Sequence, residues 1–249
     1  MDITLMGTAS AASGAGRDNT YLLLQNDTDC TMVDVGGNPL GKLKQLQISS
    51  HQVKRVVFTH LHIDHIYGLP SLLWGMWLDQ RTEPLDIYCD EEGREWLEQW
   101  LDHLKVTQWA IRFEVRVMTY TWEKPSVIAE GKDWTMSVFP SRHSVPTVGV
   151  KMVHEGKVMV YSSDTMVNPE IKKISNIDLL IHEATTAHKK LEFHTSLKEL
   201  AGFYNWSAVE RVTLVHMTDN EPYMEVLGQL PEEIHRKITV GQELTTVTL

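Results

Sequence analysis

The chain has 249 residues, of which 42% are hydrophobic and 22% are charged, and its formal net charge is −10. This composition is typical of a globular protein with a sizeable core, and we expect residues 1–249 to form one α/β domain. The acidic balance argues against a protein that wraps long nucleic acid, because a basic face supplies much of that affinity. The sequence predicts neither a secretory signal nor an apolar run near the roughly 20 residues that a membrane span needs.

Both cysteines lie in runs with strand character. Cys30 belongs to DCTMVDV and Cys89 to LDIYC. We expect both to be small buried side chains rather than partners in a disulfide, which fits a reducing compartment. The predicted location is therefore the cytoplasm.

In the first half of the chain, β-branched runs alternate with helical patterns. Strands are predicted for ITLMG, TYLLLQ, CTMVDVG, RVVFTH and LDIYC, and helices for residues 39–48, 65–80 and 91–105. The helix at 91–105 carries an apolar stripe that includes Trp96 and Trp100, and we assign this stripe to the core.

The second half begins with four predicted strands in residues 113–163 without a helix, namely FEVRVMTY, WTMSVFPS, VGVKMVH and KVMVYSS. Then come strand DLLIHEA, a helix at 195–205, strand RVTLVHM, a helix at 221–229, and strands KITVG and TTVTL. Because strands crowd both halves, we predict two mixed sheets packed face to face with helices outside. A single doubly wound sheet fits less well.

A dense group of ionisable side chains follows the apolar run RVVF. His60, His62, Asp64 and His65 occupy four of six consecutive positions. His60 and His62 are two apart in extended chain and share a face, whereas Asp64 and His65 come where a helix begins. A lone histidine is usually an ordinary core or surface residue. At this density, however, imidazole and carboxylate groups indicate a site for zinc or a related divalent ion.

The pattern His-X-His-X-Asp-His at 60–65 resembles the signature of the metallo-β-lactamase superfamily. The other motifs of that superfamily have counterparts in the same order, at Asp34, His143, Asp164 and His216. The resemblance covers essentially the whole chain. It implies a four-layer αβ/βα sandwich with two metal ions between the sheets.

The resemblance also implies the ligands: His60, His62 and His143 for one ion, Asp64, His65 and His216 for the second, and Asp164 bridging both. Asp34 would orient a ligand from outside the coordination sphere. Two ions about 3.5–4 Å apart would lower the pKa of a bridging water from 15.7 toward about 7, which supplies hydroxide at neutral pH. Zinc suits these ligands, and manganese, iron or cobalt accept similar ones.

Other segments resemble the ribonuclease Z-like phosphodiesterases of this superfamily, namely GTASAASGAGRDNT, the Gly-Leu-Pro at 68–70, HSVPT, HEAT and HTS. This resemblance implies that His194 is a general acid and transition-state cation oriented by Glu183, and that Asp64 accepts a proton from the attacking water. A purely structural Glu183–His194 pair is the alternative. His182 and His188 are not expected to bind metal.

Two departures from this branch concern the substrate. Full ribonuclease Z enzymes carry a protruding arm that clamps tRNA, but here His143 and Asp164 are 21 positions apart and enclose a predicted tight hairpin. After His216 the segment MTDNEPY lacks an Arg that contacts phosphate in the branch. Large RNA is therefore the less favoured partner. A basic patch for it would have to come from Lys42, Lys44, Lys189, Lys190 and Lys198.

We therefore predict a metal-dependent phosphodiesterase that cleaves a cyclic or short phosphodiester. The alternatives are tRNA 3′-end processing, hydrolysis of a lactone, ester or β-lactam on the same fold, and a binding protein without catalytic metal. The helix at 65–80 and residues 106–135 are expected to border the pocket, with Trp74, Trp77 or Trp109 as stacking candidates unless they belong to the core. The apolar stripe from Leu69 to Trp77 is a candidate homodimer contact.

Overall fold

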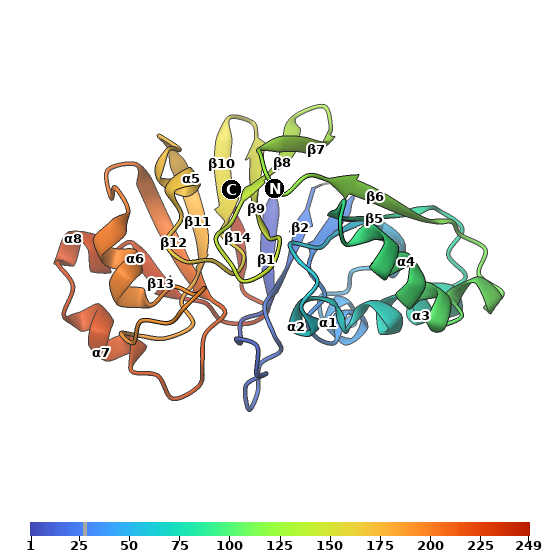
Figure 1. Ribbon diagram of the computed structural model, residues 1–249, viewed down its shortest axis with the longest axis horizontal. Helices are drawn as coiled ribbons and strands as arrows, with labels where there is room; N and C mark the ends of the chain where they lie inside the picture. Colours follow the sequence, from blue (N-terminus) through green and yellow to red (C-terminus); the bar gives the residue numbers. More distant parts are fainter. Residues whose placement is uncertain (27–28) are drawn as a thin grey trace.

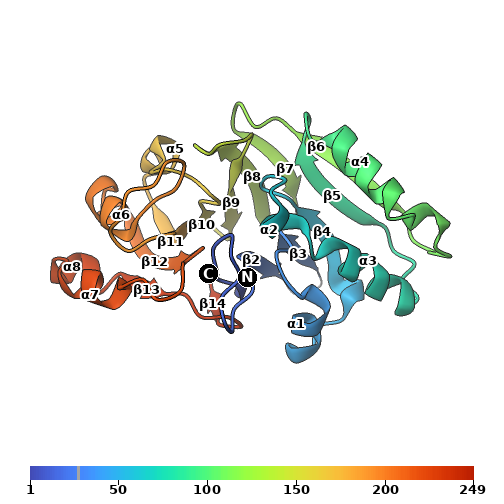
Figure 2. The ribbon, with the colours of Figure 1, turned by 60° about the horizontal axis from the view of Figure 1, so that its bottom comes forward.

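Two mixed sheets of seven strands each face one another in the computed structural model, which describes residues 1–26 and 29–249. The strand orders are β14-β1-β2-β3-β4-β5-β6 and β13-β12-β11-β10-β9-β8-β7. Helices cover the outer face of each sheet, and the two termini lie close together (Figures 1 and 2). The predicted four-layer αβ/βα sandwich is confirmed.

The first sheet uses strands from the N-terminal half and the last strand of the chain: β1 (Asp2–Gly7), β2 (Tyr21–Gln25), β3 (Cys30–Val33), β4 (Val53–Val57), β5 (Leu85–Asp90), β6 (Val115–Tyr120) and β14 (Thr246–Thr248). Strands β3 to β6 run parallel, and β14, β1, β2 and β3 pair antiparallel. The helical segments of this half are α1 (Pro39–Gln45), η1 (Ser50–Gln52), α2 (Ile63–Ile66), α3 (Leu69–Leu78), α4 (Arg94–His103) and η2 (Val106–Gln108).

The second sheet contains β7 (Ser126–Glu130), β8 (Trp134–Pro140), β9 (Val148–His154), β10 (Lys157–Tyr161), β11 (Ile177–Glu183), β12 (Val209–Val215) and β13 (Ile238–Val240). Here β10 to β13 are parallel, and β7 to β10 are antiparallel. Its helices are α5 (Pro169–Lys172), α6 (Leu197–Phe203), α7 (Tyr223–Gly228) and α8 (Glu232–His235).

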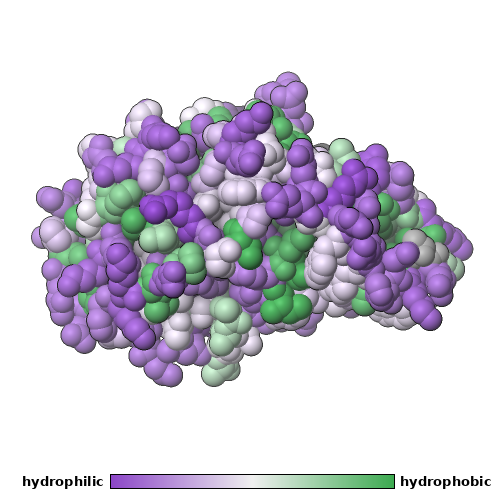
Figure 3. All heavy atoms as spheres, in the orientation of Figure 1, coloured by the Kyte–Doolittle hydropathy of each residue, from purple (hydrophilic) through white to green (hydrophobic). Residues whose placement is uncertain are grey.

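Alternation of side chains along the strands separates three apolar cores. In β2, Leu22 and Leu24 enter the core between the sheets, whereas Tyr21 and Leu23 face the core beneath α1, α3 and α4. A third core joins the second sheet to its own helices. On the face seen in Figure 3, apolar side chains gather near the middle and polar ones prevail toward both ends.

The predicted helix at 65–80 is divided into α2 and α3 at Gly68. The Gly68 amide donates to the Val35 carbonyl at 2.8 Å. A Cβ at this position would lie 2.5 Å from the Val35 oxygen and 2.6 Å from the Gly37 oxygen. The backbones therefore approach too closely for any other residue, and Pro70 restarts the helix in its first turn.

One further strand and two further α-helices were not predicted. Strand β7 lies at the edge of its sheet and has no buried side chain, so it shows no apolar alternation, and residues 113–163 hold five strands rather than four. Helices α5 and α8 are four residues long, too short for a helical period. The expectation that Trp96 lies in the core is wrong, because this side chain is 47% exposed.

The two cysteines are confirmed as buried free thiols. Burial raises the pKa of Cys30 to about 11 and that of Cys89 to about 12, so neither is a ready thiolate at neutral pH. Among the described residues, no helix has the length and apolar character to cross a membrane.

Replacing Leu22 with Ala should lower the free energy of unfolding by about 2–5 kcal/mol, because it opens a cavity between the sheets. Leu78→Ala is the control, since Leu78 is 59% exposed and its loss should change stability by no more than about 0.5 kcal/mol. Urea denaturation of both variants under the same metal conditions measures the difference. Similar losses in the two variants would contradict the assigned core.

Candidate metal centre

All seven predicted ligands lie in segments that follow strands and meet at one edge of the sandwich. His60 to His65 follow β4, His143 follows β8, Asp164 follows β10 and His216 follows β12. Strand ends are rigid, and open α/β sheets bind ligands beyond the carboxyl ends of their strands. The fold therefore brings together groups that lie up to 156 positions apart in the chain (216 − 60).

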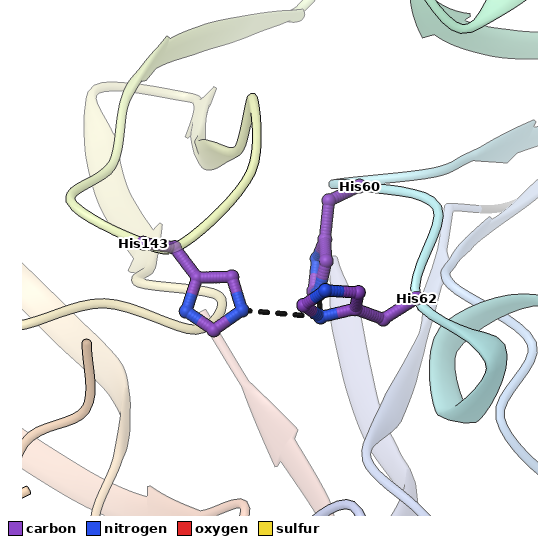
Figure 4. A group of neighbouring side chains, drawn as sticks. All are labelled: His60, His62 and His143. Carbon is purple, nitrogen blue, oxygen red and sulfur yellow. Dashed lines mark hydrogen bonds between the residues drawn. The ribbon is translucent and has the colours of Figure 1, made fainter. Parts of the chain in front are cut away.

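Three imidazoles form the first half of the cluster. The Nδ1 atom of His62 lies 3.0 Å from Nε2 of His60 and 3.1 Å from Nε2 of His143. Figure 4 shows the His143 ring reaching across from the opposite sheet toward the other two. Burial, together with the charge on His65, lowers the pKa of His60 well below its usual value and favours the neutral imidazole that binds metals.

Asp64, His65, Asp164 and His216 form the second half. Nε2 of His65 lies 3.4 Å from Asp64 Oδ2 and 3.5 Å from Asp164 Oδ1, and Nε2 of His216 lies 3.6 Å from Asp64 Oδ2 and 3.2 Å from Asp164 Oδ2. Asp164 Oδ2 is also 3.9 Å from the Nε2 atoms of His60 and His143. Asp164 thus lies between the two halves.

Four atoms at the centre of this group are buried and have no hydrogen-bond partner among the described residues: Asp64 Oδ2, His65 Nε2, Asp164 Oδ1 and His216 Nε2. Buried polar atoms without partners are costly, and two adjacent carboxylates repel each other. Oxygen and imidazole nitrogen are ligands that divalent ions accept, so the cluster fits bound cations.

Hydrogen bonds on the outer side of the rings decide which nitrogen faces inward. Asp34 Oδ2 accepts from Nδ1 of His65 at 2.8 Å, and the Phe193 carbonyl accepts from Nδ1 of His143 at 3.1 Å. Nδ1 of His60 lies 3.1 Å from the Thr59 hydroxyl. A donor at Nδ1 leaves the Nε2 lone pair available to a metal, so these contacts orient the ligands.

Hydrogen bonds from Thr59 hold the Asp34 carboxylate in place beside His65. Thr59 donates to its carboxylate twice, from the amide at 2.8 Å and from the hydroxyl at 2.9 Å. Burial raises the pKa of Asp34, and the hydrogen bonds from His65 and Thr59 oppose that rise. Its φ of 63° lies in the left-handed region, which Asp tolerates better than most residues.

Glu183 and His194 do meet, as the motifs predict. Nδ1 of His194 lies 3.0 Å from Glu183 Oε1, which also accepts from the Thr165 amide at 2.7 Å. Although burial favours the neutral ring, the hydrogen bond and charge of Glu183 raise the pKa of His194. The His194 ring lies 5.0 Å from that of His143 and 5.3 Å from that of His216, centre to centre.

Thr185 was not singled out in the sequence, although it belongs to the HEAT segment. Its hydroxyl donates to Glu183 Oε2 at 2.7 Å and lies 2.9 Å from Nδ1 of His216. Thr185 therefore couples the Glu183–His194 pair to a candidate metal ligand. The Phe193 carbonyl was also missed, because a backbone group leaves no residue-type signal.

The structure also shows the surroundings of the remaining histidines, lysine and tryptophans that the sequence singled out. His182 is buried, with Nε2 2.8 Å from the Tyr204 hydroxyl, and neither it nor His188 belongs to a metal-binding group. Lys42 is not available to a basic patch, because it is buried in ion pairs with Asp18 and Glu243. Trp74, Trp77 and Trp109 pack against one another.

A family model supplies the decisive comparison. The model described as "Anti-Pycsar protein Apyc1" matches residues 1–230. The chain belongs to this family. The match includes every candidate ligand of the Apyc1 family member described above.

The chain is also similar to curated proteins and to solved structures. Ribonuclease Z from Methanothermobacter thermautotrophicus is 24% identical, over 99% of this chain and 96% of the relative. Human tRNase Z, short form (ELAC1), has a TM-score of 0.80 at 21% identity, covering 100% of this chain and 99% of that chain. Zn(2+)-bound PqqB from Methylobacterium extorquens has a TM-score of 0.78 at 14% identity, covering 100% of both chains.

Some of these relatives are longer. Matches to ribonuclease Z of Methanococcus maripaludis and Methanococcus aeolicus cover 71% of this chain but only 58% and 55% of those proteins. The comparisons confirm the ribonuclease Z-like branch of the metallo-β-lactamase superfamily and a hydrolase that acts on phosphodiester bonds. The fold and the His/Asp cluster imply divalent metal ions.

Asp34→Asn should weaken metal binding about 10- to 100-fold, because the amide cannot support His65 as a carboxylate does. Asn tolerates the left-handed backbone, so this variant tests the charge rather than the chain conformation. Competition with a chelator measures the affinity. Asp178→Asn is the control, since Asp178 also accepts from a backbone amide, that of Val158, but lies outside the cluster. Unchanged affinity in Asp34→Asn would contradict this role.

Proposed function

We propose that the protein hydrolyses a cyclic or short phosphodiester with the help of two divalent ions. The observation that carries the proposal is the convergence of seven side chains, four of which hold a buried nitrogen or oxygen atom without a hydrogen-bond partner among the described residues. Because Asp164 lies within 3.9 Å of ligands from both halves, a bridging position is assigned to it.

We assign His60, His62 and His143 to one ion, Asp64, His65 and His216 to the other, and Asp164 to both. Zinc is the ion that these ligands suit best, with manganese, iron or cobalt as alternatives. When bound, such ions supply an activated water and positive charge for the phosphate oxygens. Asp64 lies within the cluster, with Oδ2 3.4 Å from Nε2 of His65 and 3.6 Å from Nε2 of His216, and we assign it the proton released by the attacking water.

The Glu183–His194 pair serves the leaving group in this proposal. The hydrogen bond and charge of Glu183 raise the pKa of His194 and so favour the protonated ring, and Glu183 is fixed by hydrogen bonds from Thr165 and Thr185. A positioned imidazolium donates its proton to a departing alkoxide and stabilises the negative charge that develops there. Glu183 is a positioning residue, and His194 is the proton donor.

The connection between the candidate ligands His143 and Asp164 supports a small substrate. Strands β9 and β10 are joined directly at Glu155 and Gly156, whose φ values of 49° and 80° are those of a tight hairpin turn. No arm extends from this hairpin, and Lys42 is occupied by Asp18 and Glu243. The hairpin therefore offers no arm for tRNA, and Lys42 is not available to a basic patch.

Processing of tRNA 3′ ends is the second candidate, because the relatives named ribonuclease Z align with most of the chain. It uses the same bond chemistry on a larger substrate. Incubating metal-quantified protein with precursor tRNA and with a 3′,5′-cyclic nucleotide distinguishes the two candidates. Faster cleavage of the precursor tRNA would overturn the small-substrate proposal.

Removing the metal with a chelator should abolish hydrolysis of bis(p-nitrophenyl) phosphate, and adding zinc or manganese should restore it. Asp164→Ala should lower kcat/KM at least about 1,000-fold, because it removes the residue assigned to both ions. Release of p-nitrophenol is followed with the wild type, with Asp164→Ala and with Asp178→Ala as the control. Full activity of protein shown to be free of metal would end the proposal.

His194→Ala should reduce kcat about 100- to 10,000-fold for a cyclic nucleotide, whose alkoxide leaving group needs a proton. The loss should be about ten-fold or less for bis(p-nitrophenyl) phosphate, since p-nitrophenolate leaves readily without one. Glu183→Gln should show the same leaving-group dependence in weaker form. Equal losses on both substrates would assign His194 to a structural or binding role instead.

A further inference from the structure

One hydrogen bond joins the two sheets directly behind the candidate ligands. The hydroxyl of Ser163, which follows β10 of the second sheet, donates at 2.7 Å to the hydroxyl of Thr59, which follows β4 of the first. Ser163 immediately precedes Asp164, and Thr59 immediately precedes His60. Both hydroxyl-bearing side chains are buried. The bond therefore ties together two strand ends that carry candidate ligands from opposite sheets.

Ser163 completes the bonding of the Thr59 hydroxyl, which has one proton and two lone pairs. The proton goes to Asp34 Oδ2 at 2.9 Å, and one lone pair accepts from Ser163. The second lone pair faces Nδ1 of His60 at 3.1 Å, so that nitrogen has to be the donor. A His60 ring with its proton on Nδ1 leaves the lone pair of Nε2 for a metal.

The same chain of hydrogen bonds reaches the other half of the cluster. Asp34 Oδ2, which accepts from Thr59, also accepts from Nδ1 of His65 at 2.8 Å. One pair of hydroxyl groups therefore supports His60 in the first half and His65 in the second. Without the proton from Ser163, the Thr59 hydroxyl would keep a buried lone pair without a donor and could turn its own proton away from Asp34.

The backbone at Ser163 indicates that the hydroxyl is the reason for a serine at this position. Its φ of 53° lies in the left-handed region, which glycine adopts without the steric cost that a Cβ brings. Asp34 and His216 have the same kind of conformation at the ends of β3 and β12, with φ values of 63° and 51°. Residues held in this region cluster at functional sites, where the surrounding contacts maintain them.

We propose that Ser163 is a positioning residue for the metal centre. Through Thr59 it fixes the proton on Nδ1 of His60, and it holds Asp164 at its spacing from the first sheet. Asp164 Oδ2 lies 3.9 Å from His60 Nε2, and the hydrogen bond between the two hydroxyl groups sets this separation from behind. The inference rests on the metal centre of the proposed function and does not depend on the substrate.

Ser163→Gly should weaken zinc binding about ten-fold, as measured by competition with a chelator, because the ligands lose a group that supports them through Thr59. In the zinc-loaded protein, the NMR signal of the proton on Nδ1 of His60 should be lost through exchange with water. The corresponding signal of His143 should remain, because the Phe193 carbonyl holds that proton independently. Since glycine accepts the left-handed backbone, the variant tests the hydroxyl alone.

Thr59→Val should cause the same loss of the His60 signal and lower the zinc affinity about 10- to 100-fold, whereas Thr59→Ser should retain both. Ser50→Gly is the matched control for Ser163→Gly. The Ser50 side chain is also buried, and its hydroxyl donates at 2.7 Å to Asp79, outside the cluster. This control should keep the affinity and both ring signals of the wild type.

Unchanged zinc affinity with a retained His60 signal in Ser163→Gly would overturn the inference. Loss of the His143 signal as well, or equal losses in Ser50→Gly, would also overturn it, because either result would indicate a general opening of the structure. Absence of phosphodiester hydrolysis by the wild type would instead contradict the proposed function. The affinity and the ring signals would still decide the role of Ser163, because neither measurement requires turnover.

Discussion

The buried meeting of two carboxylates and five imidazoles is the constraint on which the rest of the structure depends. Without a cation, Asp64 and Asp164 would repel each other, and several inward nitrogen and oxygen atoms would lack partners. This need for a cation explains the outer contacts of the rings. Asp34 and the Phe193 carbonyl each hold an Nδ1–H, so that the opposite nitrogen faces the centre. The sandwich supplies the rigid strand ends that keep these contacts in place.

The same arrangement links the metal cluster to the Glu183–His194 pair. Thr185 touches both His216 and Glu183, and Glu183 in turn holds His194. Changes at the Glu183–His194 pair therefore also reach a candidate metal ligand. On the opposite side, the His62 loop forms one wall of a pocket that Trp96 also lines.

Much of the fold and the site could be predicted because the signals are local. Apolar runs marked the central strands, and the segment from His60 to His65 concentrates four ionisable groups in six residues. The misses have physical causes. The edge strand β7 buries no side chain and so has no apolar pattern. The helical stripe that contains Trp96 resembles a core stripe, but the neighbouring sheet covers only part of it.

The sequence by itself determined the chemical types: imidazole and carboxylate groups at strand ends, two layers of apolar strands, and a tight hairpin between His143 and Asp164. Only the tertiary structure decided which groups meet, because His143, Asp164 and His216 come from the second sheet and reach the His60–His65 segment of the first by packing. It also decided which ring nitrogen faces inward and which tryptophan remains open. These outcomes depend on contacts between distant segments, which no local pattern encodes.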